Sequence, residues 1–237
     1  MTNYWGGSSS ATTHLLEAMH YRGMLRVTRR EDGIRIYGPY EHGPGPADKA
    51  ARLAAIDALA DVAVRNYAPL PAASLSGLVS RLRHAAPQWH GELRTALKRA
   101  KQRLSHAQVD GVDWYWPTGE TPTRHAPQDL VRLLAPFDPL VWDRRRFEML
   151  WGWPYRFEAY TPAHKRKLGY YALPLLWRDR VIGWGNVSLK NGALAADLGY
   201  VGPRPPRDAA FKRELEAELE RLRAFLVTGV ARFPSGG

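Results

Sequence analysis

The first part of the chain combines one helix-like pattern with one hairpin-like pattern. Apolar residues spaced three and four apart predict a helix over residues 11–21. Two alternating runs, 25–30 and 34–39, flank an Asp-Gly turn and predict a β-hairpin. A helix followed directly by a hairpin is the order of a recognition helix and its wing. Residues 1–44 are therefore expected to be the C-terminal part of a winged helix.

The same order recurs with three helices between residues 47 and 118. A long helix is predicted over about 48–67, with its apolar residues on one face. A second, short helix is expected to be capped by Ser74 or Ser76, and a third to span about 91–104. A second alternating stretch with an Asp-Gly turn follows and predicts another hairpin. The range 47–118 is therefore expected to be a complete winged-helix domain.

Beyond residue 125 the pattern changes to short segments. Short helices are expected over 129–153, where Pro136 and Pro139 interrupt them. Strands are predicted at 155–160, 170–177 and 180–189, with one more in the stretch after Lys190. These strands predict a small β-barrel-like domain over 125–204.

A final helix is predicted over about 208–227, ending at Gly229, and is expected to pack on the strands as a segment of 207–230. The predicted fold class is α+β. Tandem winged-helix units, the first one incomplete, precede a small antiparallel β-barrel or sheet and a C-terminal helix.

Composition adds a strong positive charge to this picture. The chain has 237 residues, a formal net charge of +11 and nine tryptophans. Such a surplus favours a polyanionic partner, because each Lys or Arg beside a phosphate releases condensed counterions. Alternatively, the charge reflects a GC-rich genome in which Arg replaces Lys generally.

Several classes of protein are disfavoured by the residues themselves. The chain has no cysteine, which rules out disulfides, thiolate metal sites and a cysteine nucleophile, and suits a reducing cytosol. Its start lacks the pattern of a secretory signal, and no run approaches the length of a membrane span. The eight histidines show no metal-site spacing, and no Gly-rich phosphate loop is present. We therefore expect a cytoplasmic, nucleoid-associated protein with no cofactor and no metal.

One block of the sequence, residues 134–183, carries a family resemblance. The block contains Phe137-Asp138, Trp142-Asp143-Arg144, the aromatic run 155–160, the basic run Lys165-Arg166-Lys167, Gly169-Tyr170-Tyr171, Leu173-Pro174 and Val181-Ile182-Gly183. This arrangement resembles the hallmark C-terminal block of the YcaQ-like (AlkZ-type) winged-helix DNA glycosylases. Tandem winged helices followed by a β-barrel, the architecture of that family, also fit the pattern upstream. Trp184 and Asn186 stand where the family has Arg and Asp.

The resemblance implies a reaction and a partner. The family hydrolyses the bond between an N-alkylated base and deoxyribose, unhooks interstrand crosslinks and requires no metal. Its catalytic segment, a Gln, an apolar residue and a Gln or Asp, lies in the first winged helix and is expected upstream of Met1. The string Gln108-Val109-Asp110 matches that segment in letters only, because it lies in a predicted wing. No catalytic residue is therefore assigned to this chain.

Ten cations are expected to contact double-stranded DNA. They are Arg29 and Arg30 at the first wing tip, Arg94, Lys98 and Lys101 on the third helix of 47–118, Arg144 and Arg145, and Lys165, Arg166 and Lys167 between two strands. The third helix of a winged helix normally enters the groove. Contacts of this kind to phosphates give affinity without sequence information.

Each of these sets has a structural alternative. The alternative for the wing tip is a solvated turn, and the alternative for the helix stripe, for which phosphate contact is favoured, is a solvated face. The arginines after Asp143 fit a hinge in which that carboxylate pairs with a neighbouring Arg. We expect Trp142, Tyr170 and Tyr171 to pack rather than to bind DNA.

Three functional hypotheses remain open at this point. The chain is a glycosylase whose catalytic winged helix comes from a separately encoded chain, a non-catalytic DNA-binding module with a regulatory or accessory role, or the remnant of a truncated gene. If the preceding helices are lost, Leu15, Leu16 and Met19 are expected to form an exposed apolar face. We expect the chain to bind duplex DNA with strong salt dependence.

Overall fold

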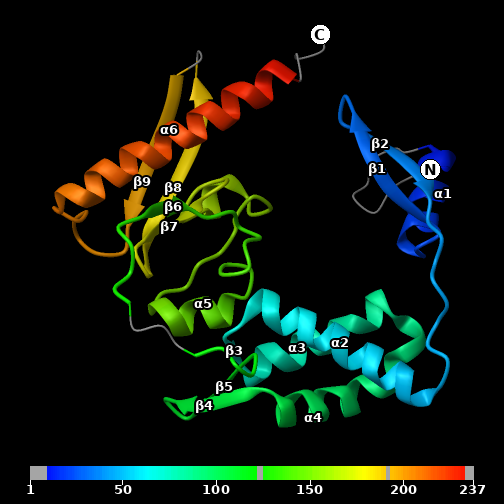
Figure 1. Ribbon diagram of the computed structural model, residues 1–237. Coiled ribbons are helices and arrows are strands. Elements are labelled where there is room, and N and C mark those ends of the chain that lie inside the picture. The colour runs from blue at the N-terminus through cyan, green and yellow to red at the C-terminus, as the bar shows by residue number, and fades with distance from the viewer. Residues whose placement is uncertain (1–9, 122–124, 191–192, 233–237) are drawn as a thin grey trace. The chain divides into compact units, whose positions relative to one another are not determined.

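The computed structural model describes residues 10–121, 125–190 and 193–232 (Figure 1). The chain divides after Ala47 into two compact units, the second of which spans Asp48–Thr228. Within the described ranges there are six α-helices and three β-sheets, and none of these sheets closes into a barrel. The predicted α+β class is confirmed.

The first unit contains the predicted helix and hairpin. Helix α1 spans Ala11–Tyr21, and strands β1 (Leu25–Glu31) and β2 (Ile34–Pro39) pair antiparallel. Asp32 and Gly33 both have positive φ, 47° and 81°, which is the backbone that an Asp-Gly hairpin turn requires. These three elements were therefore predicted correctly from spacing and turn chemistry.

The first unit encloses no buried side chain within residues 10–47. Leu15 is 60% exposed, while Leu16 and Met19 are half-buried. Helix and hairpin touch each other without a core between them, so their mutual contacts bury little apolar surface.

Three helices open the second unit. They are α2 (Lys49–Tyr67), α3 (Ala72–Ala85) and α4 (Leu93–Arg103), with a 3-10 helix η1 (Pro87–Glu92) before the last. The long helix was predicted within one residue, and Asp48 caps it by accepting a hydrogen bond from Ala51 N at 2.8 Å.

The predicted start of α3 was wrong. The helix begins at Ala72 with no side-chain cap, and Ser74 and Ser76 lie inside it. Its start is set instead by a two-residue strand, β3 (Leu70–Pro71), which pairs with β5 (Val112–Trp116). A tertiary pairing therefore overrides the local capping signal.

Small residues let the three helices approach closely. Ala60 of α2 and Ala96 and Ala100 of α4 are all 0% exposed. Ala96 packs with Ile56 and Leu93, and Leu75 and Val79 of α3 share one core with Ala60 and Ala100. The second hairpin, β4 (Ser105–Val109) with β5, closes it through the buried ring of Tyr115 and confirms the predicted strand pair.

The rest of the second unit is built on an open antiparallel sheet. Its strands, in spatial order, are β6 (Val131–Leu133), β7 (Leu173–Trp177), β8 (Arg180–Lys190) and β9 (Ala193–Tyr200). Helix α6 (Ala209–Arg232) lies along one face in Figure 1 and buries Phe211 and neighbouring leucines against it. Helix α5 (Arg144–Trp151) and the loop after it contribute an aromatic core. Phe147, Trp153 and Tyr155 pack there against Val181.

Four expectations for this region differ from the structure in whole or in part. The described strands form an open sheet, not a barrel, because β6 and β9 are its edges. Residues 155–160 form no strand: Tyr155 is buried and donates its hydroxyl to Ala172 O at 2.8 Å, so packing explains the aromatic pattern there. Of the short helices expected over 129–153, α5 forms after the two prolines, whereas turns surround Pro136 and Pro139 and the strand β6 was missed. Helix α6 continues past Gly229 to Arg232.

Candidate nucleic-acid interface

The cations of α4 divide into two sets, and the first is held by acidic residues of α2. Arg99 donates to both carboxylate oxygens of Asp57 at 2.8–3.1 Å. Arg103 reaches Asp57 at 3.0 Å and Asp61 at 2.9 Å. The hydrogen bonds to Asp57 raise the pKa of Arg99 above its ordinary value. These two arginines therefore join α4 to α2. Their positive charges are neutralised by the carboxylates of Asp57 and Asp61, so they are poor candidates for binding an anion.

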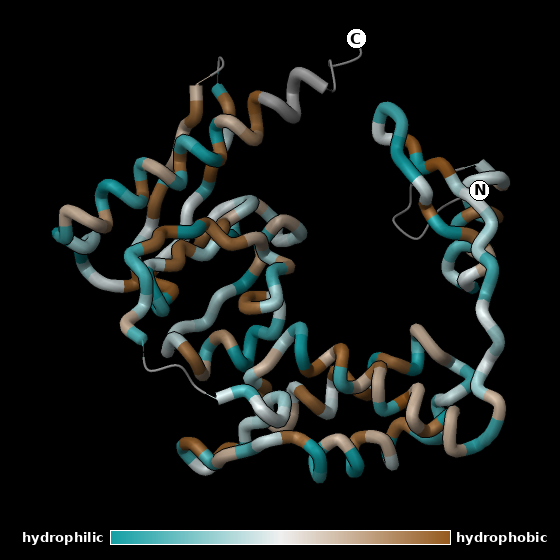
Figure 2. The backbone as a smooth tube through the Cα atoms, viewed as in Figure 1, coloured by the Kyte–Doolittle hydropathy of each residue, from teal (hydrophilic) through white to brown (hydrophobic). Residues whose placement is uncertain are grey.

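The second set is the predicted stripe of Arg94, Lys98 and Lys101. Four- and three-residue steps place the three side chains on one face of α4, and Figure 2 shows hydrophilic and hydrophobic residues alternating along this helix. Arg94 and Lys98 are exposed, and Lys101 is half-buried with its Nζ 5.4 Å from the centre of the Tyr115 ring. No carboxylate within the described ranges lies within 4.0 Å of these cations.

A polar cavity lies beside the start of this stripe. It has a volume of about 470 Å³ and is lined by hydroxyls and a histidine around Arg94. The polar side chains are Ser76, Ser80, His90 and Thr95. Hydroxyls and a guanidinium in one hollow are suitable donors for a phosphate oxygen.

At the first wing tip, the two predicted cations are partly engaged within the hairpin. Arg29 forms an ion pair with Glu31 at 2.6 Å, and both side chains are more than half exposed. Arg30 donates to Gly33 O at 3.3 Å, across the turn. An exposed pair of this kind contributes only about 0–1 kcal/mol to stability.

The basic loop 165–167 is held by a buried carboxylate. Glu158 is 6% exposed and accepts hydrogen bonds from the backbone N–H groups of Lys167 at 2.8 Å and Leu168 at 2.7 Å. The side chains of Lys165 and Lys167 remain exposed. Glu158 therefore fixes the backbone of the loop while the two ammonium groups stay at the surface.

Two further contacts complete this loop. Arg166 is half-buried, donates to Thr161 O at 2.7 Å and lies 4.8 Å from the centre of the exposed Tyr170 ring, so it shapes the loop rather than extending from it. Asn186 donates to Leu168 O at 2.8 Å and would collide with any Cβ at position 169. The Asn at this position thus has a clear structural role.

The three consecutive arginines of α5 have different surroundings. Arg144 and Arg145 are exposed, and Arg145 lines a hollow of about 150 Å³ together with Arg81, Ser74 and Trp142. The guanidinium of Arg81 lies 4.9 Å from the Trp142 ring centre, and Trp142 packs on the helical core as expected. Tyr171 packs edge-on against Phe157 as expected, with ring centroids 4.9 Å apart, although it is 47% exposed, whereas Tyr170 is 61% exposed.

Arg146 is a structural residue. It is 1% exposed, and its guanidinium donates to the backbone carbonyls of Tyr67 and Pro139. Burial lowers its pKa, and the carboxylates of Asp143 and Asp138 oppose that effect. Asp143 caps α5 by accepting from Arg146 N at 3.2 Å. The end of α2 is therefore tied to α5 by one buried cation.

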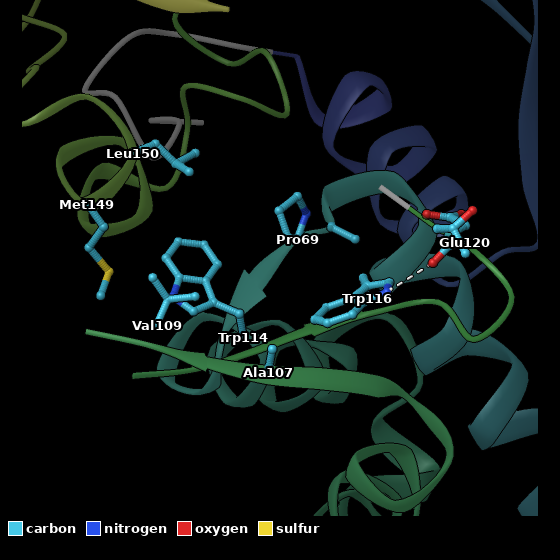
Figure 3. A pocket seen from close by; sticks show the side chains of 10 residues that line it. Pro69, Ala107, Val109, Trp114, Trp116, Glu120, Met149 and Leu150 are labelled. Atoms are coloured by element: carbon cyan, nitrogen blue, oxygen red, sulfur yellow. Dashed lines mark hydrogen bonds between the residues drawn. The ribbon is translucent and has the colours of Figure 1, made fainter. Parts of the chain in front are cut away.

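An apolar pocket of about 600 Å³ lies between the β4–β5 hairpin and α5. In Figure 3, Met149 and Leu150 of α5 lie at one end, and Glu120 lies beside Trp116 at the other. Trp114 lines the floor with Trp116, and Val109 of the Gln108-Val109-Asp110 string also lines it. Sequence analysis did not identify this pocket, although two tryptophans two positions apart on a strand signal one shared apolar face.

Two further properties concern the described residues alone. No three His, Asp or Glu side chains in these ranges come together as a possible metal site. No helix within them combines the length and apolarity needed to cross a membrane.

Comparison with known proteins identifies the family of this chain. No solved structure matches the chain. The family described as DNA glycosylase AlkZ-like matches residues 2–225, which is nearly the whole chain. The chain therefore belongs to the AlkZ-like DNA glycosylase family.

Proposed function

We propose that the chain binds duplex DNA along the stripe Arg94, Lys98 and Lys101, as the DNA-holding part of a DNA glycosylase. In this proposal residues 47–118 are a winged helix, α4 is its groove-facing helix and the β4–β5 hairpin is its wing. The single observation that carries the proposal is the division of the α4 cations. Carboxylates neutralise Arg99 and Arg103, whereas no carboxylate among the described residues pairs with the stripe, of which Arg94 and Lys98 are exposed and Lys101 is half-buried over Tyr115.

Further contacts are proposed for cations away from α4. In the second unit these are Arg144, Arg145, Lys165 and Lys167, which are all exposed. In the first unit, Arg29 and Arg30 would meet phosphates from the turn of the hairpin. Arg166 would act through the shape of its loop. Family membership supports a role in excision of a damaged base, for which we propose N-alkylated bases and interstrand crosslinks as substrates.

Titration of duplex DNA at several salt concentrations tests the binding proposal. A plot of log K against log salt has a slope of about −0.9 for each phosphate neutralised. The double variant Arg94→Ala/Lys98→Ala should weaken binding and make this slope shallower by about 1.8. A slope unchanged by these substitutions would remove the stripe from the interface.

A matched control is available on α6. The double variant Arg213→Ala/Arg223→Ala removes the same formal charge from exposed residues that pair with Glu214 and Glu220. It should leave the salt slope nearly as it is in the wild type. An equal effect of both double variants would mean that only net charge matters.

The enzymatic part is tested separately, with alkylated duplex DNA and detection of abasic sites. We propose that the string Gln108-Val109-Asp110 takes no part in the reaction, because it lies at the turn of a β-hairpin. Gln108→Ala should therefore leave any excision unchanged. Loss of excision in that variant, with DNA affinity retained, would contradict this assignment.

A further inference from the structure

The apolar pocket beside the second hairpin has the form of a stacking site. Trp114 and Trp116 occupy alternate positions of β5, so both indoles lie on one face of the hairpin. Trp116 Nε1 donates to Glu120 O at 3.1 Å, which fixes the orientation of that ring. The volume of about 600 Å³ lies in the range of sites that enclose small organic groups.

The charges of the lining select the kind of ring that fits. Among the described lining residues there is one carboxylate, Glu120, and no Lys or Arg. A phosphate inside the pocket would therefore be repelled, whereas a neutral ring with N–H donors would find an acceptor in the Glu120 carboxylate. A nucleobase has this combination of a flat face and edge donors.

A cation that could bind the DNA backbone lies outside the pocket on α5, the helix that also contributes Met149 and Leu150 to the pocket. Arg145 is exposed and precedes the pocket residue Met149 by four positions on α5. One helical turn separates the two side chains on one face, about 6 Å along the axis. A strand whose phosphate meets Arg145 would thus bring its base close to Met149 and the indoles.

We propose that this pocket receives an unpaired nucleobase of DNA, stacked on Trp114 and Trp116. The inference rests on the proposed DNA binding and adds a second, separate contact to it. Stacking of a base on an aromatic side chain tolerates any base sequence, because every base has a flat face. The protein would therefore prefer duplexes that contain an unpaired base over fully paired ones.

The test compares two labelled duplexes of equal length, one fully paired and one with a single bulged 2-aminopurine. Wild-type protein should bind the bulged duplex more tightly and change its 2-aminopurine fluorescence. Trp114→Ala should lose at least about fivefold in affinity for the bulged duplex. Its affinity for the paired duplex should change less than twofold.

A second variant guards against loss of folding. Ala107 lies on β4 opposite Trp114 and lines the pocket from an exposed position, so Ala107→Phe fills the space without removing core contacts. It should give the same selective loss. Phe225→Ala, at a 73% exposed residue of α6, is the matched aromatic control and should change neither affinity.

The outcomes separate the two proposals. Failure of the wild type to bind either duplex would overturn the proposed DNA binding itself. Binding of the paired duplex with no preference for the bulge would overturn the stacking pocket alone. Equal effects of Trp114→Ala and Phe225→Ala would also overturn it.

Discussion

Arg99 donates from Nε and Nη2 to the two carboxylate oxygens of Asp57, joining α4 to α2 through a pair of hydrogen-bonded ions. The two side chains are 26% and 21% exposed, so solvent screens the pair only in part. Such a geometry holds both partners in a fixed position and gives the helix pair its orientation.

The first prediction concerns this pair. Arg99→Ala should lower the free energy of unfolding by about 1–3 kcal/mol, because a charge-assisted, half-buried contact is lost. Urea denaturation of the wild type, both single variants and the double variant with Asp57→Ala should give a coupling energy of at least about 1 kcal/mol. Arg213→Ala, in an exposed pair, should change stability by less than about 0.5 kcal/mol. A coupling near zero would show that the contact adds nothing.

The second prediction concerns Arg146. Arg146→Met should lower the free energy of unfolding by about 2–5 kcal/mol, since it leaves the carbonyls of Tyr67 and Pro139 without their donor. Arg146→Lys should rescue little, because an ammonium group lacks the planar fork that reaches both carbonyls. The exposed neighbour Arg145→Ala is the control. Thermal unfolding that matches the wild type in both Arg146 variants would contradict the proposed clamp.

A third prediction follows from the buried hydroxyl of Tyr155. Burial raises the pKa of this phenol above its ordinary value of 10.0. The folded state therefore favours the protonated form, so this stabilisation is complete below about pH 10 and declines as the pH rises further. Tyr155→Phe should cost about 1 kcal/mol at pH 7 through the lost bond to Ala172 O. Above pH 10 the difference between the two proteins should shrink, as measured by urea denaturation across pH. A difference that grows with pH would reverse the assigned sign.

The fourth prediction concerns the loop that holds Lys165 and Lys167. Gly169 has a φ of 122°, and a Cβ there would lie 2.3 Å from Asn186 Oδ1. Gly169→Ala should therefore displace the loop, lower stability by about 1–3 kcal/mol and weaken duplex binding. Gly77→Ala, in helix α3 with open space around it, should instead stabilise by about 0.5–1 kcal/mol. Equal melting temperatures for both variants would contradict this account.

Much of the helical half of the fold could be predicted from local pattern. The periodic apolar residues of α2 and the Asp-Gly turns of both hairpins are signals within a few residues, and the structure follows them. The start of α3 could not be predicted in this way, because a strand pairing between Leu70 and Tyr115, 45 positions apart in sequence, decides it. The hydroxyl of Ser74, which is a common helix-capping group, predicts a start later than the observed one at Ala72.

The strand region was less predictable, because apolar residues that alternate with polar ones also occur where side chains pack without forming a strand. Tyr155 and Phe157 alternate with polar residues, yet they join an aromatic cluster instead of a ladder. An open sheet and a closed barrel also share the same strand pattern, since closure depends on whether the two edge strands meet. The sequence pattern of β6 and β9 does not show whether these two edge strands pair with each other.

Site residues could be predicted by type and spacing but not by partner. The stripe at Arg94, Lys98 and Lys101 follows directly from helical periodicity. That Arg99 and Arg103 on the same helix are neutralised depends on Asp57 and Asp61, some forty residues earlier. The apolar pocket needs α5 beside a distant hairpin, and only the folded chain brings Met149 and Trp114 together.

Helix α4 contains two sets of cations, one paired with carboxylates and one with no acidic partner in the described part of the chain, and this separation matters for the design of variants. Cations that maintain the helix pair and cations that face solvent are separate residues of one helix. Under the proposed function, changes at Arg94 and Lys98 should alter the affinity for DNA and leave the melting temperature nearly unchanged, whereas changes at Arg99 and Arg103 should alter the melting temperature.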